Sequence, residues 1–252
     1  MEISIRDKFI SLWKKYFGDV ELPITFYYSD DDGTFEHLKP RKGRSCLICE
    51  LAKVRKGKSL AFSEEEIKCG GGKRYTGFTD KLRPNFEYFL SCGIPGTMEG
   101  ERYIQSPGMV AEVLKNMKVL PAVGKFLIFR RWDLLEETDK PEVVIFFARG
   151  EVLSGLFTLA IFDQVEPNGV ISPFGAGCGS IIHYPRIEQQ SERPRAVLGM
   201  FDPSARPCVP VDWLSFAVPM KKFVKMIDYM EDSFLITPTW KKVLKKYKDS
   251  QV

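Results

Sequence analysis

Cysteines are the residues of this chain whose type and spacing could do the most chemistry. The chain has six of them, and Cys46 and Cys49 form a Cys-x-x-Cys pair. On the first turn of a helix the two side chains would share one face, and the amide dipoles there favour thiolates. Metal sites and dithiol chemistry both use such a pair, so a cysteine site is the first functional hypothesis.

An iron–sulfur or other metal site needs more ligands than one pair supplies. Cys69 could supply the third ligand, and Cys92 or Cys178 the fourth. Thiolates are the usual ligands of iron–sulfur clusters, so the preferred prediction is an iron–sulfur cluster or a related metal. The predicted ligands are Cys46, Cys49, Cys69 and Cys178, with Cys92 as an alternative to Cys49 or Cys178.

Glycines flank two of these cysteines. Three glycines and a lysine follow Cys69, and Cys178 stands between two glycines. Small residues let backbone amides approach the sulfur atoms of a cluster and tune its potential by hydrogen bonding. The predicted cofactor-binding residues are Gly70, Gly71, Gly72, Lys73, Gly177 and Gly179.

Three other interpretations stay open. Free cysteine often acts as a small buried hydrophobe, and the chain would then be an interaction protein without a cofactor. The glycine-rich loops could instead hold a phosphate-bearing small molecule, such as a nucleotide, a flavin or coenzyme A, with charge from Lys73 and Arg74. Cys46 could also be an activated nucleophile, but His37 and His183 are better interpreted as structural or solvent-facing, and no reaction is predicted.

The composition limits the classes of protein to consider. The chain has 252 residues, of which 44% are hydrophobic and 28% charged, as in ordinary globular proteins. Its net charge of +4 is spread along the sequence, so no nucleic acid is expected as a partner. The cysteine and glycine motifs allow a small molecule or a redox partner instead. The cysteines are too sparse for a disulfide scaffold, and each needs its own explanation.

Nothing in the sequence predicts export or membrane insertion. The longest apolar runs, residues 143–148 and 156–162, fall short of the roughly 18 to 20 residues of a membrane helix. The first eight residues carry acids and lack the apolar run of a secretory signal. We therefore expect a soluble, cytoplasmic protein with no membrane partner.

Strand and helix patterns alternate along the chain and predict an α+β fold with a mixed sheet and flanking helices. Helices are expected over residues 5–17, 46–57, 107–118, 152–162 and 219–229, and strands over 23–28, 59–62, 123–129, 143–147 and 197–201. Residues 86–91 are predicted to be a strand or a buried segment, and the glycines after Cys69 a loop. At the C-terminus, Trp240 and Tyr247 lie on an apolar stripe among lysines, which predicts a helix docked on its own domain.

The second half of the chain repeats the order of the first. Each half gives a strand, a helix and then a cysteine in a glycine-rich loop, so Cys69 is matched with Cys178. We predict a single domain over residues 1–252, with two similar halves at 1–137 and 138–252. Packed about an approximate twofold axis, the halves would bring the two cysteine loops face to face.

The order of these motifs resembles the domain-of-unknown-function 169 family. The resemblance rests on Cys46 with the run at residues 52–57, Cys69 with its glycines to Phe78, residues 141–148, and Gly177-Cys178-Gly179. It extends from about residue 23 to residue 229. It implies a soluble protein of the kind found in archaea and bacteria, and it supplies no catalytic residues.

Overall fold

An eight-stranded mixed sheet forms the centre of the molecule in the part of the chain that the structure describes. That structure, a computed structural model, describes residues 4–33, 35–37 and 46–249. The strand order is β2-β3-β4-β1-β5-β8-β7-β6, in which β2 and β3, and β6 and β7, are parallel and all other neighbours antiparallel. The strands are β1 (Ile24–Ser29), β2 (Glu36–His37), β3 (Leu60–Ser63), β4 (Phe126–Arg131), β5 (Val143–Ala148), β6 (Val170–Ile171), β7 (Ala196–Gly199) and β8 (Leu214–Pro219).

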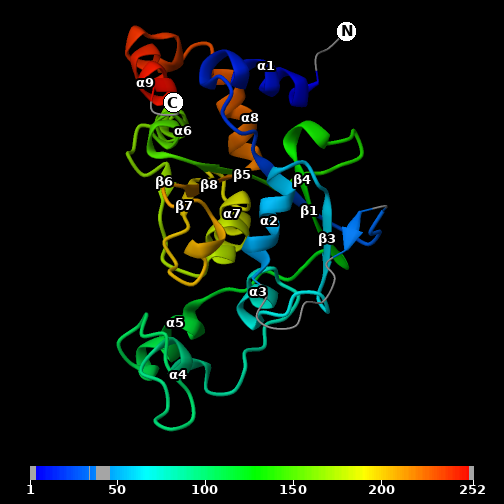
Figure 1. Ribbon diagram of the computed structural model, residues 1–252, viewed down its shortest axis with the longest axis vertical. Helices are drawn as coiled ribbons and strands as arrows, with labels where there is room; N and C mark the ends of the chain where they lie inside the picture. Colours follow the sequence, from blue (N-terminus) through cyan, green and yellow to red (C-terminus); the bar gives the residue numbers. More distant parts are fainter. Residues whose placement is uncertain (1–3, 34, 38–45, 250–252) are drawn as a thin grey trace.

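Helices cover both faces of the sheet, with α1, α6, α8 and α9 on one face and α2, α3 and α7 on the other (Figure 1). The prediction of an α+β fold with a mixed sheet and flanking helices is confirmed. The helices are α1 (Ile5–Phe17), α2 (Leu47–Arg55), α3 (Gly70–Tyr75), α4 (Phe86–Leu90), α5 (Pro107–Asn116), α6 (Gly150–Ile161), α7 (Tyr184–Gln189), α8 (Met220–Tyr229) and α9 (Pro238–Asp249). Short helical turns are η1 (Trp132–Leu134), η2 (Gly179–His183), η3 (Arg206–Cys208) and η4 (Phe234–Ile236).

Strand β5 shows why the sheet is covered on both sides. Its side chains are apolar at every position, and alternate residues point to opposite faces. Val144 and Phe146 join the core under α1, α6 and α8, whereas Val143, Ile145 and Phe147 join the core under α2 and η2. A strand of this composition is stable only where both of its faces are buried.

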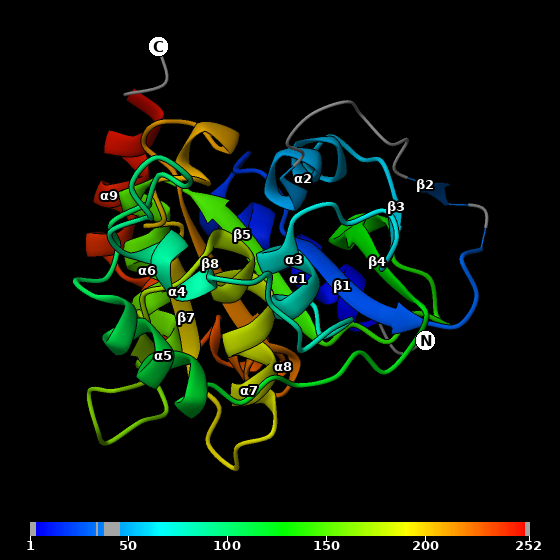
Figure 2. The ribbon, with the colours of Figure 1, turned by 90° about the horizontal axis from the view of Figure 1, so that it is seen from below.

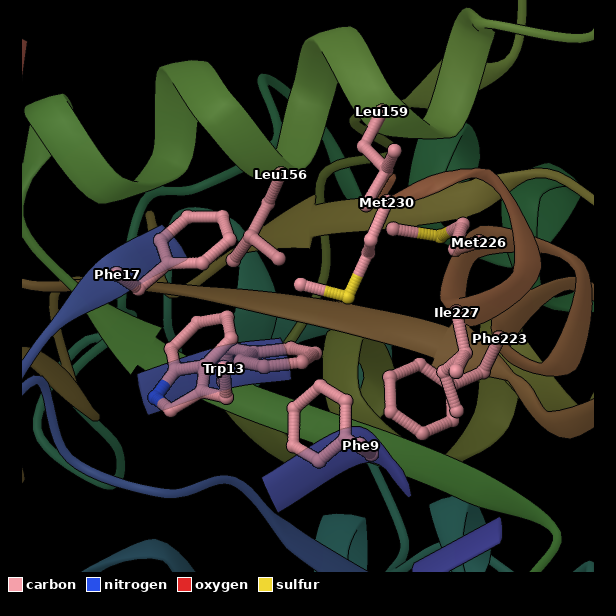
Figure 3. A pocket seen from close by; sticks show the side chains of 10 residues that line it. Phe9, Trp13, Phe17, Leu156, Leu159, Phe223, Met226, Ile227 and Met230 are labelled. Atoms are coloured by element: carbon pink, nitrogen blue, oxygen red, sulfur yellow. The ribbon is translucent and has the colours of Figure 1, made fainter. Parts of the chain in front are cut away.

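The core beneath α1, α6 and α8 contains a small cavity of about 10 Å³ (Figure 3). Its lining is entirely apolar, with Trp13, Leu156 and Met230 among the residues around it. A space of this size holds at most about one water molecule, which would find no polar partner there. The cavity is therefore a packing gap of the core.

Helix α9 docks on its own domain, as its apolar stripe predicts. Trp240 is 2% exposed and its Nε1 donates a hydrogen bond of 2.7 Å to the carbonyl oxygen of Tyr16. A Cβ atom at Gly155 would come within 2.4 Å of the Trp240 ring, so α6 requires a glycine at this contact. Within the described residues, no helix has the length and apolarity needed to cross a membrane.

The sheet order places β1 and β5 side by side at the centre, with β4, β3 and β2 beyond β1 and β8, β7 and β6 beyond β5. Counted outward from the centre, the third strand is β3 on one side and β7 on the other. In the chain, α2 precedes β3, whereas η2 and α7 precede β7. Cys46, at the start of α2, therefore corresponds in position to Cys178, at the start of η2. Cys69 has no corresponding position in the second half. Duplicated halves at 1–137 and 138–252 stay a prediction.

Residues 79–125, which we call the lobe, extend away from the sheet and contain α4 and α5 (Figures 1 and 2). The prediction of a strand or buried segment at residues 86–91 is wrong, because residues 86–90 form α4 and none of them is buried. Its aromatic residues pack within the lobe instead, and the rings of Phe86 and Phe89 are 5.8 Å apart. Aromatic content predicted burial, but these residues pack locally in the lobe and not in the sheet.

The glycines after Cys69 also differ from the prediction, since they lie in helix α3 and not in a loop. The amide of Lys73 donates to the carbonyl of Cys69 at 2.9 Å, and that of Thr76 to Gly72 at 3.0 Å. Glycine disfavours helix by about 1 kcal/mol per residue, so packing must hold this helix in place. Tyr75 provides it, because its ring lies against Gly179 of η2.

Candidate functional site

Three cysteines from distant parts of the chain start three helical segments. Cys46 is the N-cap residue of α2, Cys69 that of α3 and Cys178 that of η2. All three are free thiols, with Cys178 buried and the other two partly exposed. We call this group the three-thiol site.

The three thiols lie within electrostatic reach of one another. Burial raises the pKa of Cys178 well above its usual value, and the nearby Cys69, Cys46 and Asp202 raise it further. Burial also raises the pKa of Cys46, while the backbone amides of Ile48 and Cys49 act to lower it and Cys69 and Asp202 to raise it. Every pair of the three thiols is thus coupled. The raised pKa values favour the neutral thiol at Cys46 and at Cys178.

That protonation state bears on the hypothesis of a nucleophilic Cys46. A reactive cysteine needs a lowered pKa, and burial of Cys46 does the opposite. His183, the histidine nearest a glycine segment, packs its ring against Tyr75 and Tyr184, with centroids 5.5 and 5.2 Å apart. Its pKa is lowered to about 4 by burial and by Arg186 and Arg74. The geometry therefore gives no support to an activated thiol.

Cys49 and Cys208 form a disulfide between α2 and η3, with their Cα atoms 4.5 Å apart. The expectation that each cysteine needs its own explanation does not hold for this pair. The bond occupies the sulfur of Cys49, which the sequence predicted as a ligand. Cys92, its alternative, lies in the lobe with an exposed side chain.

The segment that carries Cys178 is fixed by a polar group that no sequence motif indicated. Asp202 is 3% exposed, and its carboxylate accepts a hydrogen bond of 3.1 Å from the Gly177 amide and others from Ser204. Ser180 Oγ donates to the Gly177 carbonyl at 2.9 Å. Met200, two residues before Asp202, has a φ of 70°, a backbone conformation that non-glycine residues rarely adopt. Strained residues of this kind concentrate at functional sites.

The predicted glycines fall into two groups. A Cβ atom at Gly72 would lie 3.0 Å from Ile67, one at Gly177 2.8 Å from Ala205 and one at Gly179 3.1 Å from Tyr75, so internal packing explains all three. At Gly70 a Cβ would meet nothing within 4 Å, and at Gly71 only the Cys69 sulfur at 3.8 Å. Neither has a positive φ. The fold itself does not require glycine at 70 or 71.

The two cations considered for phosphate binding are engaged with protein groups. Lys73 Nζ lies 3.8 Å from a carboxylate oxygen of Glu64. Arg74 is 9% exposed, and its Nη1 donates to the Asp80 carbonyl. The buried Nε of Arg74 has no hydrogen-bond partner in the described part of the chain, but the side chain has little exposed surface to offer an anion.

Aromatic side chains surround the three-thiol site. Burial raises the pKa of the Tyr75 hydroxyl and the nearby Cys178 raises it further, and the Tyr75 ring lies 5.5 Å from that of His183. Tyr103 reaches from the lobe toward Asp202 and Ser204, and its ring lies 6.0 Å from that of Phe174. The lobe therefore contributes to the surroundings of the site.

The cysteines do not form a preassembled site for a metal ion. Among the side chains in the described ranges, no group of three or more histidine, cysteine, aspartate or glutamate residues is placed to hold one. The thiols are close enough to interact electrostatically, but they are not arranged as the ligands of a single ion.

Comparison with known proteins gives one match. The family model DUF169, described as "Uncharacterised ArCR", matches residues 20–229. The matched region contains all three helix-starting cysteines and the lobe. No curated protein and no solved structure is significantly similar to the chain.

Proposed function

The chain belongs to the DUF169 family, and we propose that it is an iron–sulfur protein whose cluster is held by Cys46, Cys69 and Cys178. The observation that carries the proposal is the electrostatic coupling of these three thiols, which the chain brings together from three separate segments. A cluster spreads its thiolate ligands around several iron atoms, so it can join thiols from three segments that do not form the ligand set of one ion.

Charge supports the same assignment. Three thiolates beside Asp202 would repel one another in a partly buried space, which is why burial and mutual proximity raise the pKa values of Cys46 and Cys178. Bound iron cations would instead lower the pKa values of these thiols, because a thiol that coordinates a metal is deprotonated outright. Metal binding commonly completes a site that is not preformed, which is consistent with the spacing of the free thiols.

The binding of a phosphate-bearing small molecule is less well supported. It requires free cations beside the glycines, and Lys73 and Arg74 are engaged elsewhere. Gly72, Gly177 and Gly179 have packing roles that need no ligand.

Anaerobic reconstitution with iron and sulfide tests the proposal. The wild-type chain is expected to take up iron and inorganic sulfide in a ratio of about 1:1 and to gain broad visible absorbance. Replacing Cys46, Cys69 or Cys178 with serine should lower the iron content by about tenfold or more. Cys92→Ser is the matched control and should load like wild type, since Cys92 lies exposed in the lobe. A folded wild-type chain that takes up neither iron nor sulfide would contradict the proposal.

The unexplained glycines give a second prediction. We expect Gly70→Ala and Gly71→Ala to lower iron loading, because a cluster on Cys69 would lie against this backbone. Neither change should destabilise the fold, and alanine could add up to about 1 kcal/mol. Gly150→Ala and Gly108→Ala are matched controls in the first turns of α6 and α5, where a Cβ also meets nothing within 4 Å. Equal iron content in all four variants would show that no ligand lies over Gly70 and Gly71.

A further inference from the structure

The disulfide between Cys49 and Cys208 ties helix α2 to the segment between β7 and β8. We call that segment, residues 200–213, the strap. Cys49 is exposed on the first turn of α2, and Cys208 is partly exposed in η3 of the strap. Disulfides that only strengthen a fold usually resist reduction, whereas exposed ones are more often labile or regulatory. This bond is therefore open to attack by a reductant from solution.

The strap and α2 together cover Cys178, which is 7% exposed. A Cβ atom at the neighbouring Gly177 would lie 2.8 Å from Ala205 of the strap and 3.3 Å from Ile48 of α2. Ile48 directly precedes the α2 end of the disulfide. Ala205 shares a turn with the strap end, since the Cys208 amide donates to the Ala205 carbonyl at 2.9 Å. The bond thus joins the two segments that enclose Cys178.

The strap is held in shape largely by its own arginine. The guanidinium of Arg206 donates to carbonyl groups that all belong to the strap, those of Met200, Pro210, Val211 and Trp213. Toward the Cys178 segment, the Asp202 carboxylate accepts from the Gly177 amide at 3.1 Å and the Met200 amide donates to Ser180 Oγ at 3.4 Å. These hydrogen bonds can break and reform as the strap moves, whereas the disulfide holds it covalently.

We propose that the Cys49–Cys208 disulfide is a redox switch that controls access to the Cys178 thiol. With the bond intact, the strap shields Cys178 from solvent. With the bond reduced, η3 is released from α2, and the strap moves away from the Cys178 segment as a unit. The switch acts on the thiol of the protein itself and does not depend on the iron–sulfur assignment above.

A dithiol is the reductant, and the reaction is an ordinary thiol–disulfide exchange. One thiolate of the reductant attacks the exposed Cys49 sulfur, forms a mixed disulfide and displaces Cys208 as a thiolate. The second thiol of the reductant then displaces Cys49. The reductant leaves as a disulfide, so two electrons have passed to the protein, and the two thiol protons end on Cys49 and Cys208.

The test follows alkylation of Cys178 in iron-free, folded protein. One sample is kept oxidised, and the other is reduced with dithiothreitol and desalted without oxygen. Both are treated with iodoacetamide, and each cysteine is followed by mass spectrometry. Cys178 is expected to react at least about tenfold faster in the reduced sample, because the strap opens more often. Cys92, exposed in the lobe, is the internal control and should react equally in both.

A variant and a second measurement separate local opening from loss of the fold. In Cys49→Ser/Cys208→Ser, Cys178 should react at the fast rate with or without dithiothreitol. Hydrogen exchange should become faster in the strap and at residues 176–180 on reduction, while the central strand β5 stays protected. Reoxidation of the wild-type chain should restore slow alkylation of Cys178.

Three results would overturn the switch. One is an equal rate of Cys178 alkylation in the oxidised and reduced samples, and another is a disulfide that resists dithiothreitol in the folded chain. The third is faster alkylation accompanied by loss of protection in β5, which would show that reduction unfolds the whole chain. Every sample is free of iron, so these results leave the iron–sulfur assignment to be decided by iron uptake alone.

Discussion

Replacing Arg186 with methionine is expected to lower the free energy of unfolding by about 3–5 kcal/mol. Arg186 of α7 is 7% exposed, and its Nε donates to the Glu142 carboxylate at 3.1 Å. Its other nitrogens donate to the Tyr28 hydroxyl and to the carbonyls of Leu120 and Pro121. The substitution leaves a partly buried carboxylate without its partner. It also removes the contacts of α7, which continues from the Cys178 segment, with β1 and with the end of the lobe.

Denaturant unfolding at neutral pH measures this loss. Lys8→Met is the control, because Lys8 pairs with Asp228 at the surface and should change stability by less than about 1 kcal/mol. Adding Glu142→Gln to Arg186→Met should recover part of the loss by removing the unpaired charge. A change of under about 1 kcal/mol in Arg186→Met would show that this network contributes little.

The pH dependence of stability should contain a contribution from His183. Burial, with help from Arg186 and Arg74, lowers its pKa to about 4 from 6.5. The folded chain then binds fewer protons than the unfolded chain between these values, so the contribution of the neutral ring is present above pH 6.5 and is lost as the pH falls toward 4. The shift corresponds to about 3 kcal/mol.

Comparing wild type with His183→Gln isolates this contribution from that of the carboxylates. The difference in unfolding free energy between the two should be constant above pH 7 and should shrink as the pH falls toward 4, because glutamine cannot take up the proton. A difference that is independent of pH across this range would show that His183 titrates normally in the folded chain.

Periodic patterns predicted the elements that are buried along one or both faces. The amphipathic pattern of α1 and the continuous apolar run of β5 each determine one structure, because few other arrangements would bury their side chains. Gly70, Gly71 and Gly72 suggested a loop because glycine lowers helix propensity, whereas packing of Tyr75 holds them in α3. Strand β8 was not predicted; it runs directly into α8, and the helix expected over residues 219–229 begins at its last residue.

The candidate site was predictable only in part. Cys46, Cys69 and Cys178 stood out through their spacing and neighbouring glycines, and the structure brings these three together. The bond between Cys49 and Cys208 spans 159 residues, and nothing local to Cys208 suggested it. Asp202 was missed because a single carboxylate carries no motif, and its role arises only when the chain folds it beside Gly177.

An anomalous difference map at the iron absorption edge, from crystals of the reconstituted protein grown without oxygen, tests the central claim most directly. The account predicts one group of neighbouring iron peaks per chain, bounded by the sulfur atoms of Cys46, Cys69 and Cys178, with Cys49 outside the coordination sphere. A well-ordered chain with no iron between these three residues, or with iron bound elsewhere, would contradict it.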